Sequence, residues 1–403
     1  RALAAGGPAR FLQRLSVRWV QPRRQRRRRQ CNRAGQGGAS AGRDGKLRQL
    51  VYEDRLFGTP LKAKDADRYL YTMETFVDFP NLHVSDGGFS DPERITDANP
   101  WQSEYRWGKR ILFDFENGDG VRLQGTLAIP DDYQPSQRRP MLVQFYEKNS
   151  QNLHRHISPL YTYSWNGLMM EAISKGYLYM QPDIHINIGS PHADMLKCVE
   201  AATRKVIEMG YADPERIGLH GSSYSGQGAA YIAARSTMFA AVAAGAAATD
   251  LTGDFNRFWG WTPTNLNGPG YNGHSYDILG HGRLGTNPYD DPELYRREAP
   301  ITHARTIDTP LLMMHGGSDT NVGVMGMLQL YNGMRFNGKN IIALLYPGEF
   351  HGLRNVANRR DLTIRTQQFF DHYLRDAPAP EWMVAGVPFL KKEHGAWERG
   401  RGR

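Results

Sequence analysis

The segment Ile217-Gly-Leu-His-Gly-Ser-Ser-Tyr-Ser-Gly226 decides the fold, because it joins an apolar run to a run of small residues through a serine-containing turn. A serine held on a sharp turn between a strand and a helix needs small residues two positions before and after it, since the two backbones approach closely there. Gly221 and Ser225 occupy those positions around Ser223. Centring the turn on Ser222 would place bulky residues at both. The pattern predicts a nucleophile elbow in which a serine stands where glycine is more usual.

Apolar runs and amphipathic stretches alternate on both sides of this segment, which predicts a mainly parallel sheet with helices on both faces. Strands are expected at 141–145, 177–181, 216–220, 240–247, 310–315 and 341–346, and helices at 165–175, 193–209, 227–236, 325–336 and 362–374. The earlier runs 110–115 and 121–129 are joined by Asn117-Gly-Asp-Gly120, which favours a tight hairpin turn. An antiparallel pair of strands is therefore expected to open the domain.

An acid and a histidine follow in the order that a nucleophile elbow requires. The segment Leu311-Leu-Met-Met-His-Gly-Gly-Ser-Asp-Thr-Asn-Val322 places Asp319 just after one apolar strand, and Tyr346-Pro-Gly-Glu-Phe-His-Gly352 places His351 after the next. In an α/β-hydrolase the acid and then the histidine lie at the carboxyl ends of later strands. Ser223 is therefore predicted to attack a carbonyl carbon, His351 to carry the proton, and Asp319 to orient the imidazole.

These motifs together resemble a known family. The Ser-Tyr pair of the elbow, the His-Gly-x-x-Asp-x-x-Val segment and the Glu-x-His-Gly segment occur in the order found in the catalytic domain of prolyl oligopeptidase family serine peptidases. The chain is similar to the dipeptidyl peptidase and acylaminoacyl peptidase-like branch from about residue 110 to 387. The resemblance implies an α/β-hydrolase fold, assigned here to residues 101–387, and hydrolysis of short peptides.

The oxyanion that develops during acylation needs fixed hydrogen-bond donors. One expected donor is the backbone N–H of Tyr224, because it follows the nucleophile directly. The resemblance implies a second, the phenol of Tyr146, at the end of Pro140-Met-Leu-Val-Gln-Phe-Tyr146.

The resemblance also implies a substrate pocket. Asn321 and Val322 occupy positions at which the dipeptidyl peptidase branch lines its pocket. Phe258 and Trp259 belong to an aromatic cluster where relatives keep part of the pocket wall. Ordinary loop packing is the alternative interpretation for all four residues.

The ends of the chain differ in composition from the body. Residues 1–48 hold 14 basic residues and one acid, Asp44, so they are expected to form a disordered Arg-rich tail. Strands are expected at 69–76, 82–85 and 94–100. Residues 49–100 are interpreted as the remnant of a last β-propeller blade, since a whole propeller needs about four to eight blades. Residues 388–403 are expected to form a flexible tail.

The distribution of charge and the spacing of potential metal ligands limit which partners and cofactors are expected. The formal charge of +9 lies in the Arg-rich tail, so the body gives no general case for binding nucleic acid. No apolar stretch approaches a membrane span. His154 and His156 have no acidic partner at ligand spacing, so no metal is expected, and no dinucleotide or phosphate-binding pattern implies a cofactor. The exposed edges of a blade remnant would favour association into a homo-oligomer.

Two other functions stay open at this point. A carboxylesterase-like hydrolase would use the same scaffold, because fold alone does not fix function. A catalytically inactive, hydrolase-like interaction protein would use the basic tail for nucleic acid.

Overall fold

The structure is a computed structural model. It describes residues 18–19, 36–41, 47–105, 107–158, 168–260 and 271–386. The chain divides into two compact units. The first takes in residues 1–105 and 154–156, and the second takes in 106–153 and 157–403. Of the helices within these described ranges, none has the length and apolar character needed to cross a bilayer.

The first unit consists of antiparallel strands. One sheet has the order β4–β6–β7–β8, with β5 paired to β6, and another has the order β1–β2–β3. The strands are β1 (Arg18–Trp19), β2 (Gln36–Ala41), β3 (Leu47–Glu53), β4 (Leu56–Phe57), β5 (Leu61–Lys62), β6 (Tyr69–Glu74), β7 (Asn81–Ser85) and β8 (Glu93–Arg94). Along β6 the buried side chains alternate with half-buried ones, as period-two patterning predicts.

Two expectations for this region need correction. Part of the tail expected to be disordered is strand, because Gln36–Ala41 pairs with β3 through backbone hydrogen bonds that do not depend on apolar patterning. The strand expected after residue 94 stops at Arg94. A 3-10 helix, η1 (Pro100–Glu104), follows it, since proline suits a first helical position. The interpretation of residues 49–100 as a propeller blade stays an expectation.

The second unit is built on an eight-stranded sheet of order β18–β17–β14–β13–β11–β12–β10–β9. Its strands are β9 (Lys109–Glu116), β10 (Arg122–Ile129), β11 (Arg139–Gln144), β12 (Leu178–Pro182), β13 (Ala212–Ser222), β14 (Ala241–Gly245), β17 (Leu311–Gly316) and β18 (Ile341–Tyr346). β9, β10 and β12 pair antiparallel, and the other pairs are parallel. This is the mainly parallel sheet, opened by an antiparallel pair, that the sequence predicts.

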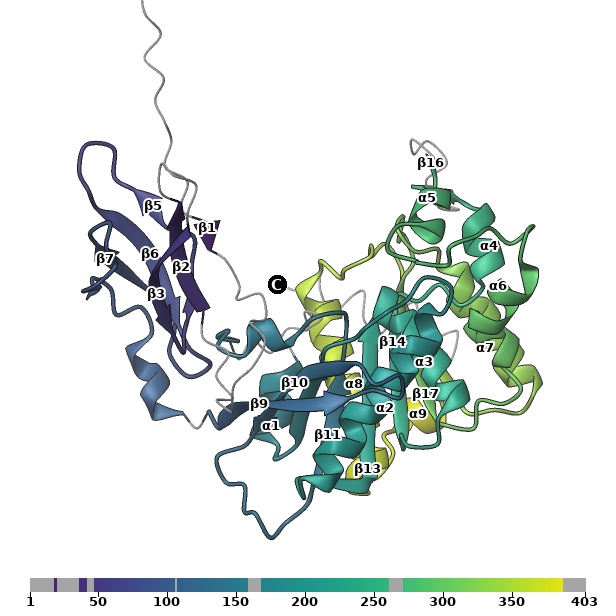
Figure 1. The fold of residues 1–403 in the computed structure, drawn as a ribbon. Coiled ribbons are helices and arrows are strands. Elements are labelled where there is room, and N and C mark those ends of the chain that lie inside the picture. The colour runs from purple at the N-terminus through teal and green to yellow at the C-terminus, as the bar shows by residue number, and fades with distance from the viewer. Residues whose placement is uncertain are drawn as a thin grey trace, which may run out of the picture. The chain divides into compact units, whose positions relative to one another are not determined.

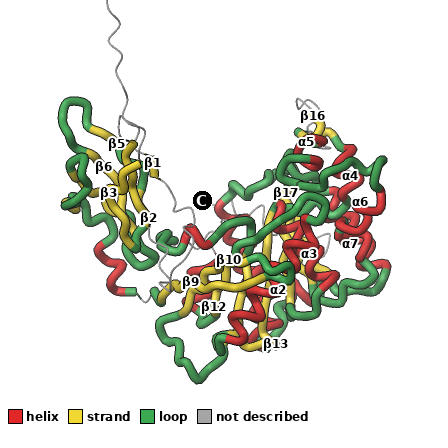
Figure 2. Tube along the Cα trace, in the orientation of Figure 1, coloured by secondary structure: helices red, strands yellow, loops and turns green. Residues whose placement is uncertain are grey.

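Helices cover both faces of this sheet. The helices that pack on its strands are α1 (Leu168–Ser174), α2 (Pro191–Glu208), α3 (Tyr224–Arg235), α7 (Met325–Phe336) and α8 (Val356–Arg375). The remaining short elements are η2 (Ser150–Asn152), α4 (Leu251–Asn256), β15 (Phe258–Trp259), β16 (Tyr271–Asn272), α5 (His274–Ile278), α6 (Pro292–Glu298), η3 (Pro300–His303) and α9 (Glu381–Val384). Figure 1 shows α2 and α3 in front of the sheet and α8 behind it, and Figure 2 shows the same layering by element type.

The alternation of side chains along β13 explains the two layers. Successive strand residues point to opposite faces. Leu219 joins the main apolar cluster together with Met195 of α2. On the other face, a Cβ on Gly218 would lie 2.7 Å from the Phe370 ring of α8, and the His220 ring lies 6.3 Å from the same ring. The sheet is therefore buried on both faces, as expected for parallel strands.

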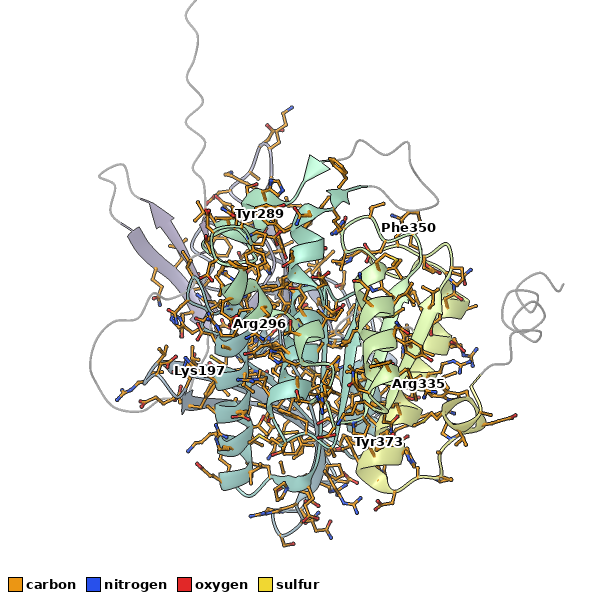
Figure 3. The ribbon with its side chains drawn as sticks, turned by 90° about the vertical axis from the view of Figure 1, so that its right-hand side faces the viewer. Lys197, Tyr289, Arg296, Arg335, Phe350 and Tyr373 are labelled. Carbon is orange, nitrogen blue, oxygen red and sulfur yellow. The ribbon has the colours of Figure 1, made fainter. Side chains whose placement is uncertain are left out.

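The carboxyl ends of the parallel strands share one edge of the sheet, and this edge positions the predicted site. Ser223 follows β13, Asp319 follows β17 and His351 follows β18. In Figure 3, Phe350, the neighbour of His351, and Tyr373 of α8 lie at opposite ends of the second unit. Loops at this edge can therefore bring residues together that lie far apart in the sequence.

Candidate active site

The turn between β13 and α3 holds Ser223 in a strained conformation. Its φ is 57° and its ψ is −124°, a region that non-glycine residues seldom adopt. A Cβ on Gly221 would lie 2.2 Å from the Ser225 carbonyl oxygen, and one on Gly226 would lie 2.2 Å from the Gly245 carbonyl oxygen. Both positions therefore require glycine, and the turn has the close backbone approach of a nucleophile elbow.

Ser225 stands at the position where the usual pattern has glycine, and the structure accommodates it. Its Oγ accepts a hydrogen bond from the Ser222 N–H and donates one to the Ser222 carbonyl oxygen, both at 2.9 Å. The Ser225 side chain is almost fully buried, with 1% of the residue exposed. Its hydroxyl thus links the first turn of α3 back to the residue that precedes Ser223.

The structure brings Ser223, His351 and Asp319 into one hydrogen-bonded chain. Ser223 Oγ lies 2.9 Å from His351 Nε2, and His351 Nδ1 lies 2.8 Å from Asp319 Oδ2. In this arrangement Nδ1–H donates to the carboxylate, and Nε2 is free to accept the Ser223 proton. The geometry is that of a general base that activates a serine hydroxyl.

The Asp319 carboxylate is buried, but donors surround it. Its Oδ1 accepts from the backbone N–H groups of Asn321 and Val322 at 2.9 and 3.0 Å. His315 Nε2 lies 3.3 Å from Oδ2 and 3.0 Å from the Val322 carbonyl oxygen. Burial alone would raise the pKa of Asp319, whereas the hydrogen bonds from His315 and His351 lower it well below its usual range. Asp319 therefore stays ionised and can stabilise a cationic His351.

The two expected oxyanion donors lie beside Ser223. A side-chain hydrogen bond joins Tyr146 to Ser223, and Tyr146 itself is 39% exposed. Partial burial raises the pKa of Tyr146, so the phenol remains a donor at neutral pH. Tyr224 is the first residue of α3, where a backbone N–H has no partner within the helix.

A group of rings behind the phenol was not predicted from the sequence. The His281 ring lies 5.7 Å from Tyr146 and 4.3 Å from Tyr224, and it stacks on Tyr276 at 5.8 Å. Arg283 forms a 2.6 Å ion pair with Glu147, the residue after Tyr146. Tyr276, His281 and Arg283 come from a segment that lies more than a hundred positions after Tyr146 and Glu147, and neither spacing nor motif connects the two segments.

The four expected pocket residues fall into two neighbouring segments. Phe258 and Trp259 form β15, and the next N–H, that of Gly260, donates to the Thr320 carbonyl oxygen at 2.9 Å. Asn321 and Val322 follow Thr320 in the Asp319 loop. Val322 is buried and Phe258 is 57% exposed. β15 therefore lies alongside the Asp319 loop, but none of the four residues lines the cavity beside Ser223.

That cavity has a volume of about 620 Å³. Its walls come from the loop after β11, between Gln144 and Asn152, from the elbow between His220 and Ser225, and from His351. Within the described residues there is no group of three or more His, Cys, Asp or Glu side chains that could hold a metal ion.

Comparisons with known proteins bear on the family and the fold of the chain. Residues 191–377 match the prolyl oligopeptidase family. The lasso peptide isopeptidase AtxE2 of Asticcacaulis excentricus is 24% identical over 314 residues, which cover 74% of this chain and 42% of that protein. Dipeptidyl-peptidase 5 of Porphyromonas gingivalis is 22% identical over 282 residues, 66% of this chain and 36% of that protein. The chain spans less than half the length of these curated relatives.

Solved structures support the fold. The ligand-free AtxE2 isopeptidase superposes with a TM-score of 0.65 at 19% identity, covering 91% of this chain and 54% of that one. The acylaminoacyl peptidase of Pyrococcus horikoshii superposes with a TM-score of 0.66 at 18% identity, covering 86% and 56%. The α/β-hydrolase fold expected from the sequence is confirmed.

Proposed function

Residues 191–377 are a prolyl oligopeptidase family domain, and on that premise we propose that the chain is a serine peptidase that hydrolyses peptide bonds of short peptides through an acyl-enzyme on Ser223. The observation that carries the proposal is the hydrogen-bonded chain from Ser223 through His351 to Asp319 at the tip of a strained elbow. A serine that only caps a turn needs neither a histidine acceptor nor an ionised carboxylate behind it.

Acylation uses the three groups in sequence. Ser223 Oγ bonds to the scissile carbonyl carbon while its proton passes to His351 Nε2. The tetrahedral intermediate then collapses: the carbon–nitrogen bond breaks, and His351 returns the proton to the leaving amine. Water repeats the steps on the acyl-enzyme and releases the carboxylic acid. Asp319 stabilises the imidazolium that forms twice in each cycle.

The oxyanion is assigned to two donors of different kinds. The Tyr224 N–H is fixed by the start of α3, and the Tyr146 phenol comes from the loop after β11. Because the phenol is hydrogen-bonded to the Ser223 side chain, it lies close to the carbonyl group that Ser223 would attack. Preorganised donors of this type account for a large share of rate acceleration in acyl transfer.

A peptide substrate also agrees with the relatives. One matched structure holds a variant of the AtxE2 isopeptidase with Astexin3-dC4 bound, and another holds an acylaminoacyl peptidase with a peptidyl chloromethyl ketone. Their names describe those proteins, and they support a peptide as the substrate class for this chain.

A fluorophosphonate reporter tests the proposal directly. We expect one adduct on the peptide that contains Ser223, and no adduct in Ser223→Ala or with His351→Ala. Ser174→Ala is the matched control, because that hydroxyl bonds only the Glu171 carbonyl oxygen at the end of α1. Matched amide and ester substrates complete the test. Turnover of esters alone would support the carboxylesterase, and a folded protein without any adduct would support the inactive interaction protein.

A further inference from the structure

The cavity beside Ser223 is lined by residues with polar side chains, whose carbon atoms also form part of the wall. Apart from Gly221, every residue that lines it carries a side-chain nitrogen or oxygen, and none is aliphatic. Ligand pockets in proteins are usually lined mainly by apolar side chains. In a cavity of about 620 Å³ a polar side chain could bond the wall's nitrogen and oxygen atoms, whereas an apolar side chain would leave those that face it without partners.

The position of the cavity relative to the triad indicates which part of a substrate enters it. His351 must deliver its proton to the leaving nitrogen, so the leaving group lies beside the imidazole. The cavity is lined by His351, Ser223 and the residue that precedes the nucleophile, Ser222. Tyr146 and Ser225 also line it, whereas Tyr224 and β15 do not. Because the imidazole is part of the cavity wall, a leaving group that takes its proton from His351 would lie in or beside this cavity.

Hydrogen bonds outside the cavity fix the part of its wall that Gln144 and Asn152 form. Gln144 donates to the Phe145 carbonyl oxygen at 3.0 Å and accepts from Gln181, which in turn accepts from Arg110. Arg110 also donates to the Asn152 carbonyl oxygen at 2.7 Å. This chain of bonds fixes the orientation of the Gln144 amide and the end of the loop together, so the wall is preorganised.

A second buried group holds the middle of the loop. The Asp183 carboxylate, at the end of β12, accepts from the backbone N–H groups of Asn149 and Ser150 at 2.6 and 2.8 Å and from the Ser150 hydroxyl at 2.6 Å. Asp183 is 9% exposed. These bonds set the short η2 turn that presents Gln151 and Asn152 to the cavity.

The elbow contributes room to the cavity. Ser222 adds only a hydroxymethyl group to the wall, and its Oγ is buried without a hydrogen-bond partner. The neighbouring Glu147 is already paired with Arg283, and Lys148 is exposed, so the wall offers mainly neutral donors and acceptors.

We propose that this cavity is a subsite for the leaving group, and that it selects an uncharged hydrogen-bonding side chain, of the size of asparagine or glutamine, at the first residue after the scissile bond. The inference rests on the proposed peptidase function, since it assigns the two sides of a bond that Ser223 attacks. It adds what that function alone does not give, namely the chemical class of residue that leaves.

Acyl transfer tests the leaving-group side by itself. An activated ester first forms the acyl-enzyme, and an added amino-acid amide then competes with water for it. The amine nitrogen bonds to the acyl carbon, Ser223 Oγ leaves, and His351 moves the amine proton to that oxygen. Because the acyl part stays constant, the ratio of aminolysis to hydrolysis reports only how the amine binds. Asparaginamide and leucinamide are nearly equal in size and form the comparison.

We expect the partition to favour asparaginamide over leucinamide by about fivefold or more. Asn152→Leu makes one wall apolar and should bring that preference to about one or reverse it. Asn340→Leu is the matched control, because Asn340 bonds Tyr373 at the far end of the sheet from Phe350 (Figure 3), and it should keep the full preference.

The outcomes separate the two proposals. Equal partition in the unmodified protein, a preference for leucinamide, or an unchanged preference in Asn152→Leu would overturn the subsite while leaving the peptidase intact. If no ester in a panel of acyl groups forms an acyl-enzyme, the proposed function itself fails, and the subsite fails with it. Formation of the acyl-enzyme is followed independently as a mass increase on Ser223.

Discussion

Removing the Ser225 hydroxyl tests how the elbow tolerates a serine at this position. The perturbation is Ser225→Ala, which deletes one oxygen and creates no clash. The two bonds to Ser222, both at 2.9 Å, are lost. A net contribution of about 1 kcal/mol for each buried hydrogen bond gives a loss of about 2 kcal/mol. Alanine recovers about 0.5 kcal/mol through its higher helix propensity, so the expected destabilisation is about 1.5 kcal/mol.

Function should change as well, because Ser222 directly precedes the nucleophile. Without the Ser225 hydroxyl, the Ser222 peptide is free to rotate, and the Ser223 hydroxyl spends less time aligned with His351. Small misplacements of reacting groups reduce rates strongly. We expect fluorophosphonate labelling of Ser223 in Ser225→Ala to be about tenfold slower than in the unmodified protein.

Two assays read these effects separately. Urea denaturation followed by circular dichroism gives the change in free energy of unfolding, and a labelling time course in the absence of urea gives the change in reactivity. Thr203→Val is the control, because it removes a buried helical hydroxyl that bonds the Val199 carbonyl oxygen, far from the elbow. It should lower stability without slowing labelling. If Ser225→Ala changes neither the denaturation midpoint nor the labelling rate, the hydroxyl does not support the elbow and the reasoning is wrong.

Three further changes have defined outcomes. Tyr146→Phe removes one oxyanion donor and should lower kcat about 10²-fold, with KM nearly unchanged in steady-state assays on a peptide anilide; an unchanged kcat would exclude the phenol from catalysis. Gly221→Ala places a Cβ 2.2 Å from the Ser225 carbonyl oxygen and should abolish labelling; full labelling would show that the turn relaxes easily. Burial lowers the pKa of His220 to about 3, below an unfolded value of about 6.5, so its neutral form stabilises the fold above pH 6.5 and that stability is lost as pH falls toward 3, by up to about 1.4 kcal/mol per pH unit. His220→Gln should flatten the dependence of unfolding free energy on pH in that window, and an unchanged slope would contradict the assignment.

The sequence predicts the positions of Ser223, Asp319 and His351 because each follows an apolar strand, and the ends of parallel strands meet at one edge. The alternation of strands and helices also predicts the sheet, since its period and turn residues are local features. Whether these three residues perform catalysis remains a proposal.

What the sequence does not predict depends on contacts between distant segments. Gln36–Ala41 contains no apolar alternation, and its strand conformation comes from pairing with β3. The His281 ring reaches Tyr146 only because the excursion after β14 folds back over the elbow. The polar cavity is assembled from a loop after β11, the elbow and His351, and no window of sequence contains all three.

The strained backbone at Ser223 keeps its conformation independently of the hydroxyl group that would react. The turn is held by bonds that do not involve the Ser223 hydroxyl: its N–H donates to the Gly245 carbonyl oxygen at 2.9 Å, and its carbonyl oxygen accepts from the Gln227 N–H at 3.0 Å. Replacing the side chain with alanine therefore leaves the turn, its neighbours and the adjoining cavity in place. Such a variant would serve as a capture reagent: immobilised and exposed to a peptide mixture, it would retain its natural ligands uncut, and their masses would identify them.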